Sequence, residues 1–178
     1  MENKKNKNIR SSYNYTALVG DLLEHFRNKE FDAIVHGCNC FHTMGAGIAK
    51  QISLEFPQAY EVDQKTPCGD YAKLGSISIG KTDCGDVINA YTQFYPGTNF
   101  EYHAFISCLN VINIQYSGKC VAFPQIGCGI GGADWLYVLN IIEDHLPDVE
   151  LTIIYYYKHY DKRKNTLGET KTNGKSKM

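Results

Sequence analysis

Residues 32–52 read DAIVHGCNCFHTMGAGIAKQI, and this stretch decides the fold class. It begins with a short apolar run, Ala33 to Val35, which is typical of a strand buried on both faces. A glycine-rich turn follows, and then Ile48, Ile52 and Phe56 recur at helical spacing until Pro57 stops the pattern. The stretch therefore predicts a buried strand, a glycine-rich loop and a helix, in that order.

The same order recurs later, where KCVAFP (119–124) runs into a second glycine-rich loop (125–132) and a helix over 133–146. We also predict strands at 13–19, 76–80, 86–94 and 150–157, helices at 21–30 and 101–116, and a loop over 60–75. Strands that alternate with helices indicate an α/β fold whose sheet is covered on both faces. Both glycine loops then leave the carboxyl edge of the sheet, where open α/β sheets bind ligands.

The chain has 178 residues, of which 43% are hydrophobic and 21% charged, as expected for one globular domain. We place that domain at 13–160, between basic tails at 1–12 and 161–178 that are expected to be disordered. The sequence contains no apolar run of the ~20 residues that a membrane span needs and no secretory signal. A cytoplasmic protein with reduced cysteines and no membrane contact is the expectation.

The net charge of −1 is unevenly distributed. Residues 1–12 hold four Lys/Arg and one Glu, and residues 158–178 hold seven Lys/Arg and two Asp/Glu, so the remaining 13–157 carry a net charge of −9. An acidic body argues against broad contact with a phosphodiester backbone, which requires clustered Lys and Arg. Nucleic acid is therefore not expected as the main ligand.

The segment HGCNCFH (36–42) places His36, Cys38, Cys40 and His42 at even spacing, which raises the question of a metal site. On an extended strand these side chains span ~20 Å, whereas zinc holds its ligands at ~2.0–2.3 Å. The spacing C-x-C also differs from the C-x-x-C of redox motifs. We expect no metal and no other cofactor here.

The two glycine loops favour an anion site instead. Glycine lets the backbone approach a ligand closely, and successive N–H groups together with a helix N-terminus bind anions. One such loop is often only a tight turn, but two from different strands of one domain favour a clamp for a diphosphate. GCGIGG lacks the spacing of a dinucleotide-binding fingerprint, and neither loop ends in the G-K-[ST] of a P-loop.

Five segments of the chain resemble macro domains. They are GDL (20–22), DAIVHGCNC with MGAGIAKQI (32–52), VINAYTQ (87–93), FPQIGCGIGGADW (123–135) and the terminal strand TIIYYY (152–157). The set is most similar to phage, bacterial and fungal members known as ADP-ribose-1″-phosphate phosphatases. The resemblance implies a three-layer α/β/α macro domain fold with a central mixed sheet, and a monomer whose ligand is ADP-ribose or ADP-ribose 1″-phosphate.

The resemblance also implies a binding site. Asp21 would accept a hydrogen bond from the adenine amino group, the N–H of Leu22 would meet the adenine ring, and Tyr157, or else Tyr156, would cover it. The first loop would hold the distal ribose and one phosphate through Asn39, Gly45, Ala46, Gly47 and Ile48. The second would cradle the diphosphate through Gln125, Ile126, Gly127, Cys128, Gly129, Ile130, Gly131 and Gly132. Alternatively, Asp21 is only a helix N-cap, and Cys128 is a small residue that fits the loop rather than a nucleophile.

Catalysis is implied less directly. One macro domain class uses a Lys before the central helix and an Asp in the second loop, and this chain has Gln93 and Gly131 at those places, which disfavours a covalent Lys mechanism. A phosphatase needs only to place the phosphate, orient a water and move one proton. The candidates are His36, expected to end its strand at the pocket floor, Asn39 on the ribose or the water, and His42 in the loop. A buried core histidine and an exposed loop residue are the simpler alternatives for His36 and His42.

Three functions follow as hypotheses. The first is an enzyme that hydrolyses ADP-ribose 1″-phosphate to ADP-ribose and phosphate. The second is a module that binds ADP-ribose without turnover, and the third is a hydrolase that removes ADP-ribose from a macromolecule by means of water.

Overall fold

The computed structural model describes residues 14–156. The predicted tails, 1–12 and 161–178, and the predicted adenine contact Tyr157 lie outside these described residues. The strands are β1 (Thr16–Val19), β2 (Ala33–Asn39), β3 (Ile77–Thr82), β4 (Gly85–Gln93), β5 (Cys120–Phe123) and β6 (Glu150–Tyr155). The helices are α1 (Leu22–Arg27), α2 (Gly47–Glu55), α3 (Pro57–Gln64), the 3₁₀ helix η1 (Tyr71–Lys73), α4 (Tyr102–Gln115) and α5 (Trp135–His145).

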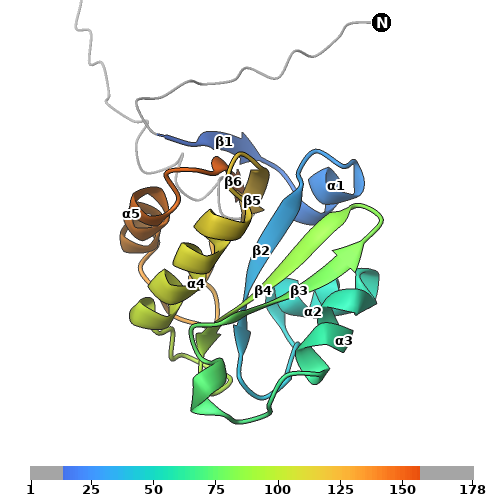
Figure 1. The fold of residues 1–178 in the computed structure, drawn as a ribbon, viewed down its shortest axis with the longest axis vertical. Helices are drawn as coiled ribbons and strands as arrows, with labels where there is room; N and C mark the ends of the chain where they lie inside the picture. The colour runs from blue at the N-terminus through green and yellow to red at the C-terminus, as the bar shows by residue number, and fades with distance from the viewer. Residues whose placement is uncertain (1–13, 157–178) are drawn as a thin grey trace, which may run out of the picture.

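The strands form one six-stranded sheet in the order β1-β6-β5-β2-β4-β3 (Figure 1). All neighbouring pairs are parallel except β3 and β4, which form an antiparallel edge. The predicted mixed sheet is therefore confirmed. Since β2 and β5 lie in the middle of the parallel part, the loops that follow them leave the same edge of the sheet.

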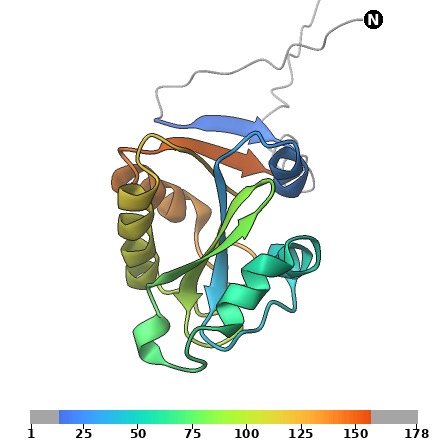
Figure 2. The same cartoon turned by 45° about the vertical axis from the view of Figure 1, so that its right-hand side comes forward.

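Helices cover both faces of the sheet, as Figure 2 shows with α4 and α5 on one side and α1, α2 and α3 on the other. Alternate residues of β2 supply both cores: Val35 packs with the α4 and α5 residues, and Ile34 packs with those of α1 and α2. Both side chains are fully buried. Each of the two interfaces removes a large apolar area from water, and this burial holds the three layers together.

The prediction of a loop over 60–75 was wrong at 60–64, which belong to α3, and at 71–73, which form η1, whereas 65–70 and 74–75 are loop. Pro57 ends α2 but is also the first residue of α3, and η1 follows at Tyr71. Proline is well suited to the first position of a helix, because its fixed φ is already helical and its missing N–H has no partner there. α3 lies close against β3 at Gly80, where an added Cβ would come within 2.6 Å of Ala59. α3 is thus part of the helical layer that it forms with α1 and α2 on this face of the sheet.

Among residues 14–156, none of the helices combines the length and the apolar character that crossing a bilayer requires.

Candidate functional site

The candidate site lies at the carboxyl edge of the parallel strands. The first glycine loop (residues 39–48) joins β2 to α2, and the second glycine loop (residues 125–132) lies between β5 and α5. A third segment, the bridging loop (residues 94–101), follows β4 and connects them. The N–H of Cys40 donates to the carbonyl of Phe94 at 3.1 Å, and the N–H of Phe100 donates to the carbonyl of Gly131 at 3.3 Å.

The second glycine loop folds back on itself. The N–H of Ala133 donates to the carbonyl of Gly127 at 3.0 Å, and that of Gly132 to Gly129 at 3.3 Å. Gly127 has a φ of +75°, and a Cβ there would lie 2.5 Å from the ring of Phe100. Only glycine meets both conditions. Beside Gly129, in contrast, an added Cβ would meet nothing within 4 Å, so this part of the loop borders open space.

Asn39 organises the first glycine loop. Its side-chain NH₂ donates to the carbonyl of Thr43 at 2.9 Å and to the hydroxyl of Thr43 at 2.7 Å, and its Oδ1 accepts from the N–H of Phe41 at 2.9 Å. The two amide hydrogens are then both in use, and one lone pair of Oδ1 remains. Asn39 is also 8% exposed. Its expected contact with the distal ribose would have to use that remaining lone pair.

His42 is the histidine of the first glycine loop, and its side chain contacts Thr66, which follows the end of α3. Its φ of +58° lies in the left-handed region, which is uncommon for a residue other than glycine. Its Nε2 lies 3.2 Å from the hydroxyl oxygen of Thr66, and that hydroxyl donates to the carbonyl of Asp63 at 2.6 Å. A hydroxyl has one hydrogen, so Thr66 accepts from His42. Neutral His42 therefore has its proton on Nε2, and its Nδ1 is free to accept a proton.

His36 lies elsewhere, which corrects the expectation that it ends its strand at the pocket floor. β2 continues to Asn39, and His36 is fully buried in the middle of the strand. Its Nε2 lies 2.7 Å from Oδ1 of Asn89, which makes Nε2 the protonated nitrogen. Burial lowers the pKa of His36 to about 4, although the hydrogen bond to Asn89 opposes this. A buried neutral imidazole in a fixed tautomer is suited to structure and not to proton transfer with a bound ligand.

A buried chain of hydrogen bonds extends from His36 to a buried ion pair. The amide of Asn89 donates to the Ser78 hydroxyl at 3.0 Å, which lies 2.6 Å from the hydroxyl of Tyr91, and Tyr91 donates to Asp63 at 2.9 Å. Nζ of Lys73 donates to the same carboxylate at 2.8 Å, and both charged side chains are only 1% exposed. This hydrogen-bond network joins β2, β3, β4, α3 and η1 beneath the first glycine loop. Of the residues in this network, His36 alone was predicted from the sequence to have a function.

The cysteines of the opening stretch have no catalytic geometry. Cys38 and Cys40 are buried, and burial is the main cause that raises the pKa of each thiol. Raised pKa values disfavour the thiolate, which is the reactive form. Cys128 in the second loop donates to the carbonyl of Ile126 at 3.2 Å. Among residues 14–156, no three His, Cys, Asp or Glu side chains are grouped so that they could hold a metal ion.

Asp21 and Leu22, which are expected at the adenine, lie at the start of α1, directly after β1. Oδ1 of Asp21 accepts from the N–H groups of Leu23 and Glu24, so this side chain caps α1. The N–H of Gly20 donates to the carbonyl of Tyr155 at 3.0 Å and so joins the ends of β1 and β6. The cap that was the alternative for Asp21 is therefore present. Asp21 has a second carboxylate oxygen, so the cap and a ligand contact are compatible.

Gln93 ends β4 beside the bridging loop, at the place where the resemblance puts a nucleophilic Lys in other macro domains. Its amide donates to the carbonyl of Gly97 and lies 3.3 Å from Oδ1 of Asn99. The Gln93 side chain thus holds the bridging loop in place.

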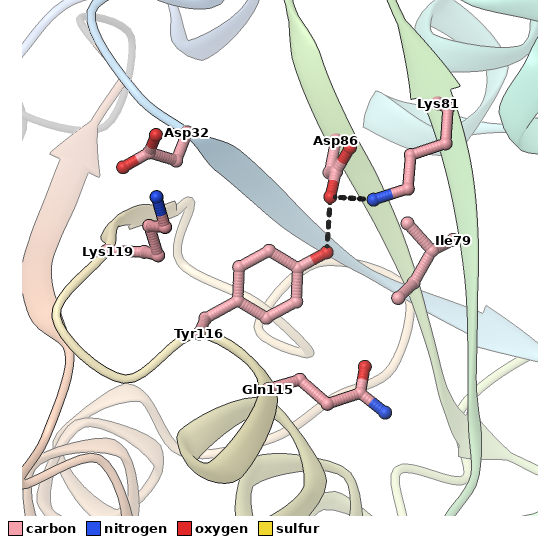
Figure 3. Close-up of a pocket in the computed structure, with 7 residues that line it drawn as sticks. All are labelled: Asp32, Ile79, Lys81, Asp86, Gln115, Tyr116 and Lys119. Carbon is pink, nitrogen blue, oxygen red and sulfur yellow. Dashed lines mark hydrogen bonds and ion pairs between the residues drawn. The ribbon is translucent and has the colours of Figure 1, made fainter.

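A hollow of about 410 Å³ lies at the opposite, amino edge of the sheet (Figure 3). Its charged groups are largely paired, because Asp86 accepts from the Tyr116 hydroxyl at 2.7 Å and from Lys81 at 2.5 Å, and Asp32 accepts from the N–H of Cys120 at 2.8 Å. Neither glycine loop lines this hollow. It is therefore separate from the candidate site.

The comparisons with known proteins agree with this geometry. A family model described as "Macro domain" matches residues 35–142, which include both glycine loops. The chain belongs to the macro domain family. A relative in Enterobacteria phage T4, described as an uncharacterized 17.5 kDa protein, is 39% identical over 146 residues, which are 77% of this chain and 93% of the T4 protein.

One further relative and two solved structures are similar to the chain. The DNA ADP-ribosyl glycohydrolase of Mycobacterium tuberculosis is 31% identical over 150 residues, which are 75% of this chain but 40% of that protein. The structure of Thermosipho africanus DarTG in complex with ADP-ribose superposes with a TM-score of 0.69 at 22% identity, over 85% of this chain and 43% of that one. The chain thus spans about two fifths of each of these proteins. The macrodomain of Thermus aquaticus DarG, of which it covers 95%, has a TM-score of 0.62 at 21% identity.

Proposed function

We propose that this macro domain binds ADP-ribose along the carboxyl edge of its sheet and hydrolyses a bond to the group on C1″ of the distal ribose. The adenine lies at Asp21 and Leu22, the diphosphate at the second glycine loop, and the distal ribose at the first. The family membership supports the ligand, and the geometry of the two loops supports its placement.

The observation on which the proposal rests is the set of open backbone amides. Within the part of the chain that the structure describes, the N–H groups of Gly129, Ile130 and Gly131 have no backbone acceptor. Ala46, at the N-terminus of α2, provides no side-chain cap for that helix. Both loops therefore offer N–H dipoles to an anion. Such dipoles explain how a body of net charge −9 over 13–157 binds a diphosphate without Lys or Arg.

The first candidate reaction is hydrolysis of ADP-ribose 1″-phosphate. Nδ1 of His42 takes a proton from a water whose oxygen attacks phosphorus, the bond from phosphorus to the C1″ oxygen breaks, and His42 returns the proton to that oxygen. Asn39 fixes the loop on which His42 lies, and Thr66 fixes the tautomer of His42. His36 takes no part in this step.

The second candidate is removal of ADP-ribose from nucleic acid. It is favoured by the name of the 31% identical mycobacterial relative. In this reaction the bond from C1″ to the base breaks, the water oxygen bonds to C1″, and the proton of the water goes to the base. The same ADP-ribose site serves both reactions, which differ in the group attached at C1″: a phosphate in the first and a nucleic-acid base in the second.

The test combines calorimetry with two assays of turnover. Wild type should bind ADP-ribose, and Gly129→Glu should abolish binding, since the new side chain enters open space at the diphosphate with a repelling charge. Asn140→Glu adds the same charge at an exposed position of α5 and should bind normally. Release of phosphate from ADP-ribose 1″-phosphate, or of ADP-ribose from ADP-ribosylated DNA, identifies the reaction. Equal ADP-ribose binding by wild type and Gly129→Glu would refute the site, and binding without either product would leave a non-catalytic module.

A further inference from the structure

Four aromatic rings form a cluster on the surface beside η1 and the bridging loop. Tyr71 is stacked on Phe94, with ring centroids 3.6 Å apart and planes 3° apart. Tyr95 is stacked on Phe41 at 5.3 Å and 17°, and it meets Phe94 edge to face at 4.8 Å. We name this cluster of Phe41, Tyr71, Phe94 and Tyr95 the aromatic platform.

The platform combines a buried base with an exposed surface. Phe94 is 6% exposed, whereas Tyr71 is 67% and Tyr95 55% exposed. Because Phe94 covers one face of the Tyr71 ring, the surface that Tyr71 presents to solvent includes its other face. Exposed aromatic groups of this kind mark interaction surfaces more often than isolated surface residues do.

The platform is rigid before any partner arrives. The carbonyl of Cys40 accepts from the N–H of Gly69 at 2.8 Å, and the N–H of Cys40 donates to the carbonyl of Phe94 at 3.1 Å. These bonds tie together the three segments that supply the four rings. A partner therefore loses little affinity to the ordering of the tyrosines.

Two carboxylates border the exposed rings. Asp70 is exposed and directly precedes Tyr71, and its Oδ1 accepts from the N–H of Ala72 at 2.8 Å, so it caps η1. Loss of hydration raises the pKa of Tyr71, and a hydrogen bond with Tyr95 and the charge of Glu101 raise it further. The exposed Glu101 is thus close enough to act on the Tyr71 ring.

The lysine of η1 does not offset these negative charges. Lys73 is buried, and its Nζ pairs with Asp63 at 2.8 Å. The body of the chain, 13–157, is also acidic. The platform thus presents aromatic faces together with a negative potential, and both features attract a cation.

We propose that the aromatic platform is a docking surface for an arginine-bearing segment of a partner protein, whose guanidinium groups stack on the open faces of Tyr71 and Tyr95. A guanidinium is planar and weakly hydrated, so it stacks on aromatic rings more readily than an ammonium group does. Asp70 and Glu101 attract its charge and repel the phosphates of a nucleic acid. The proposal is independent of the proposed function, because docking here requires no ADP-ribose at the glycine loops.

The direct test compares three fluorescently labelled peptides in which glycine alternates with arginine, lysine or citrulline. Citrulline keeps the planar shape of arginine without its charge, whereas lysine keeps the charge without the planar group. Measured by fluorescence anisotropy with the wild-type full-length chain, the arginine peptide should bind roughly 3- to 30-fold more tightly than the citrulline peptide. The lysine peptide should lie between them. Equal affinity for all three peptides would overturn the proposal.

Tyrosine substitutions locate the peptide on the protein. Tyr71→Ala and Tyr95→Ala should each weaken binding of the arginine peptide roughly 3- to 30-fold, whereas Tyr71→Phe and Tyr95→Phe keep the ring and should bind like wild type. Tyr137→Ala removes a tyrosine of α5 that is 54% exposed and lies outside the platform, and it should leave binding unchanged. Wild-type affinity in both platform alanine variants would refute the assigned surface.

Charge substitutions test the acidic border without removing a ring. Asp70→Asn combined with Glu101→Gln should weaken the arginine peptide roughly 2- to 5-fold, as expected for exposed charge pairs, and leave the citrulline peptide unaffected. Asparagine still caps a helix, and thermal unfolding would verify that each variant is folded. If a labelled single-stranded oligonucleotide bound more tightly than the arginine peptide and lost affinity in the same alanine variants, the platform would be a nucleic-acid surface and the proposal would be wrong.

Discussion

Nε2 of His42 lies 3.2 Å from the hydroxyl oxygen of Thr66, whose single hydrogen is directed to the carbonyl of Asp63. Thr66 follows His42 by 24 positions in the sequence, and its hydrogen bonds to the carbonyl of Asp63 attach it to the end of α3. The pair leaves Nδ1 of His42 as the free acceptor. The proton transfer proposed for His42 therefore depends on Thr66, which is not among the residues proposed to bind the ligand.

The first prediction concerns Thr66 as a positioning residue. Thr66→Val removes the acceptor of the His42 Nε2–H and should lower kcat roughly 10- to 100-fold with KM unchanged, since orientation is lost and binding is not. Thr66→Ser keeps the hydroxyl and should retain activity. Steady-state kinetics on whichever substrate the wild type turns over would decide this. A rise in KM at constant kcat in Thr66→Val would show that Thr66 acts on binding instead.

The second prediction concerns pH and His36. Its pKa is lowered from 6.5 to about 4 in the folded state, so the unfolded chain takes up this proton first as the pH falls. The stabilising contribution is complete above about pH 6.5 and is lost between there and about pH 4. Urea unfolding should show about 2 kcal/mol of additional loss between pH 7 and pH 5. His36→Gln should reduce this loss, and an unchanged pH dependence in that variant would exclude His36 as its source.

The third prediction concerns the buried ion pair of Asp63 and Lys73. Asp63→Asn or Lys73→Met leaves one buried charge without its partner and should lower the free energy of unfolding by about 3–5 kcal/mol. Lys81→Met breaks the ion pair between Lys81 and Asp86, in which the lysine side chain is 74% exposed. This substitution should change the free energy of unfolding by less than about 1 kcal/mol. Urea unfolding measures both. Similar effects at Lys73 and Lys81 would show that burial does not set the strength of these pairs.

The fourth prediction compares two glycines of one loop. Gly127→Ala has to adopt a φ of +75° and push against Phe100, and it should cost about 2 kcal/mol of stability or more. Gly129→Ala meets open space and should be close to neutral. Thermal unfolding of the two variants provides the comparison. Equal destabilisation would mean that the loop rearranges around either side chain.

The parts of the fold that depend on neighbouring residues were predicted from the sequence. Buried strands and glycine loops are visible as local patterns, and the resemblance to macro domains supplied the mixed sheet. α3 was missed because Pro57 was taken only as the end of α2, although proline also begins helices. The cap formed by Asp21 was considered because it connects residues two and three positions apart.

The parts of the site that depend on contacts between distant segments were not predicted. His36 was expected at the pocket floor, but its side chain faces Asn89, 53 residues away, through the register of β2 on β4. Spacing within HGCNCFH shows which residues share a face and does not show which face is covered. The link from Thr66 to His42 depends in the same way on how α3 packs, and no local pattern indicates it.

The bridging loop couples the opening motions of the two glycine loops. The bridging loop is hydrogen-bonded to Cys40 on one side and to Gly131 on the other. Neither glycine loop can therefore open without disturbing the bridging loop. The two glycine loops should therefore exchange their amide hydrogens as one cooperative unit. A ligand that touches only the diphosphate loop would then slow exchange at the N–H of Cys40 as well, where it makes no contact.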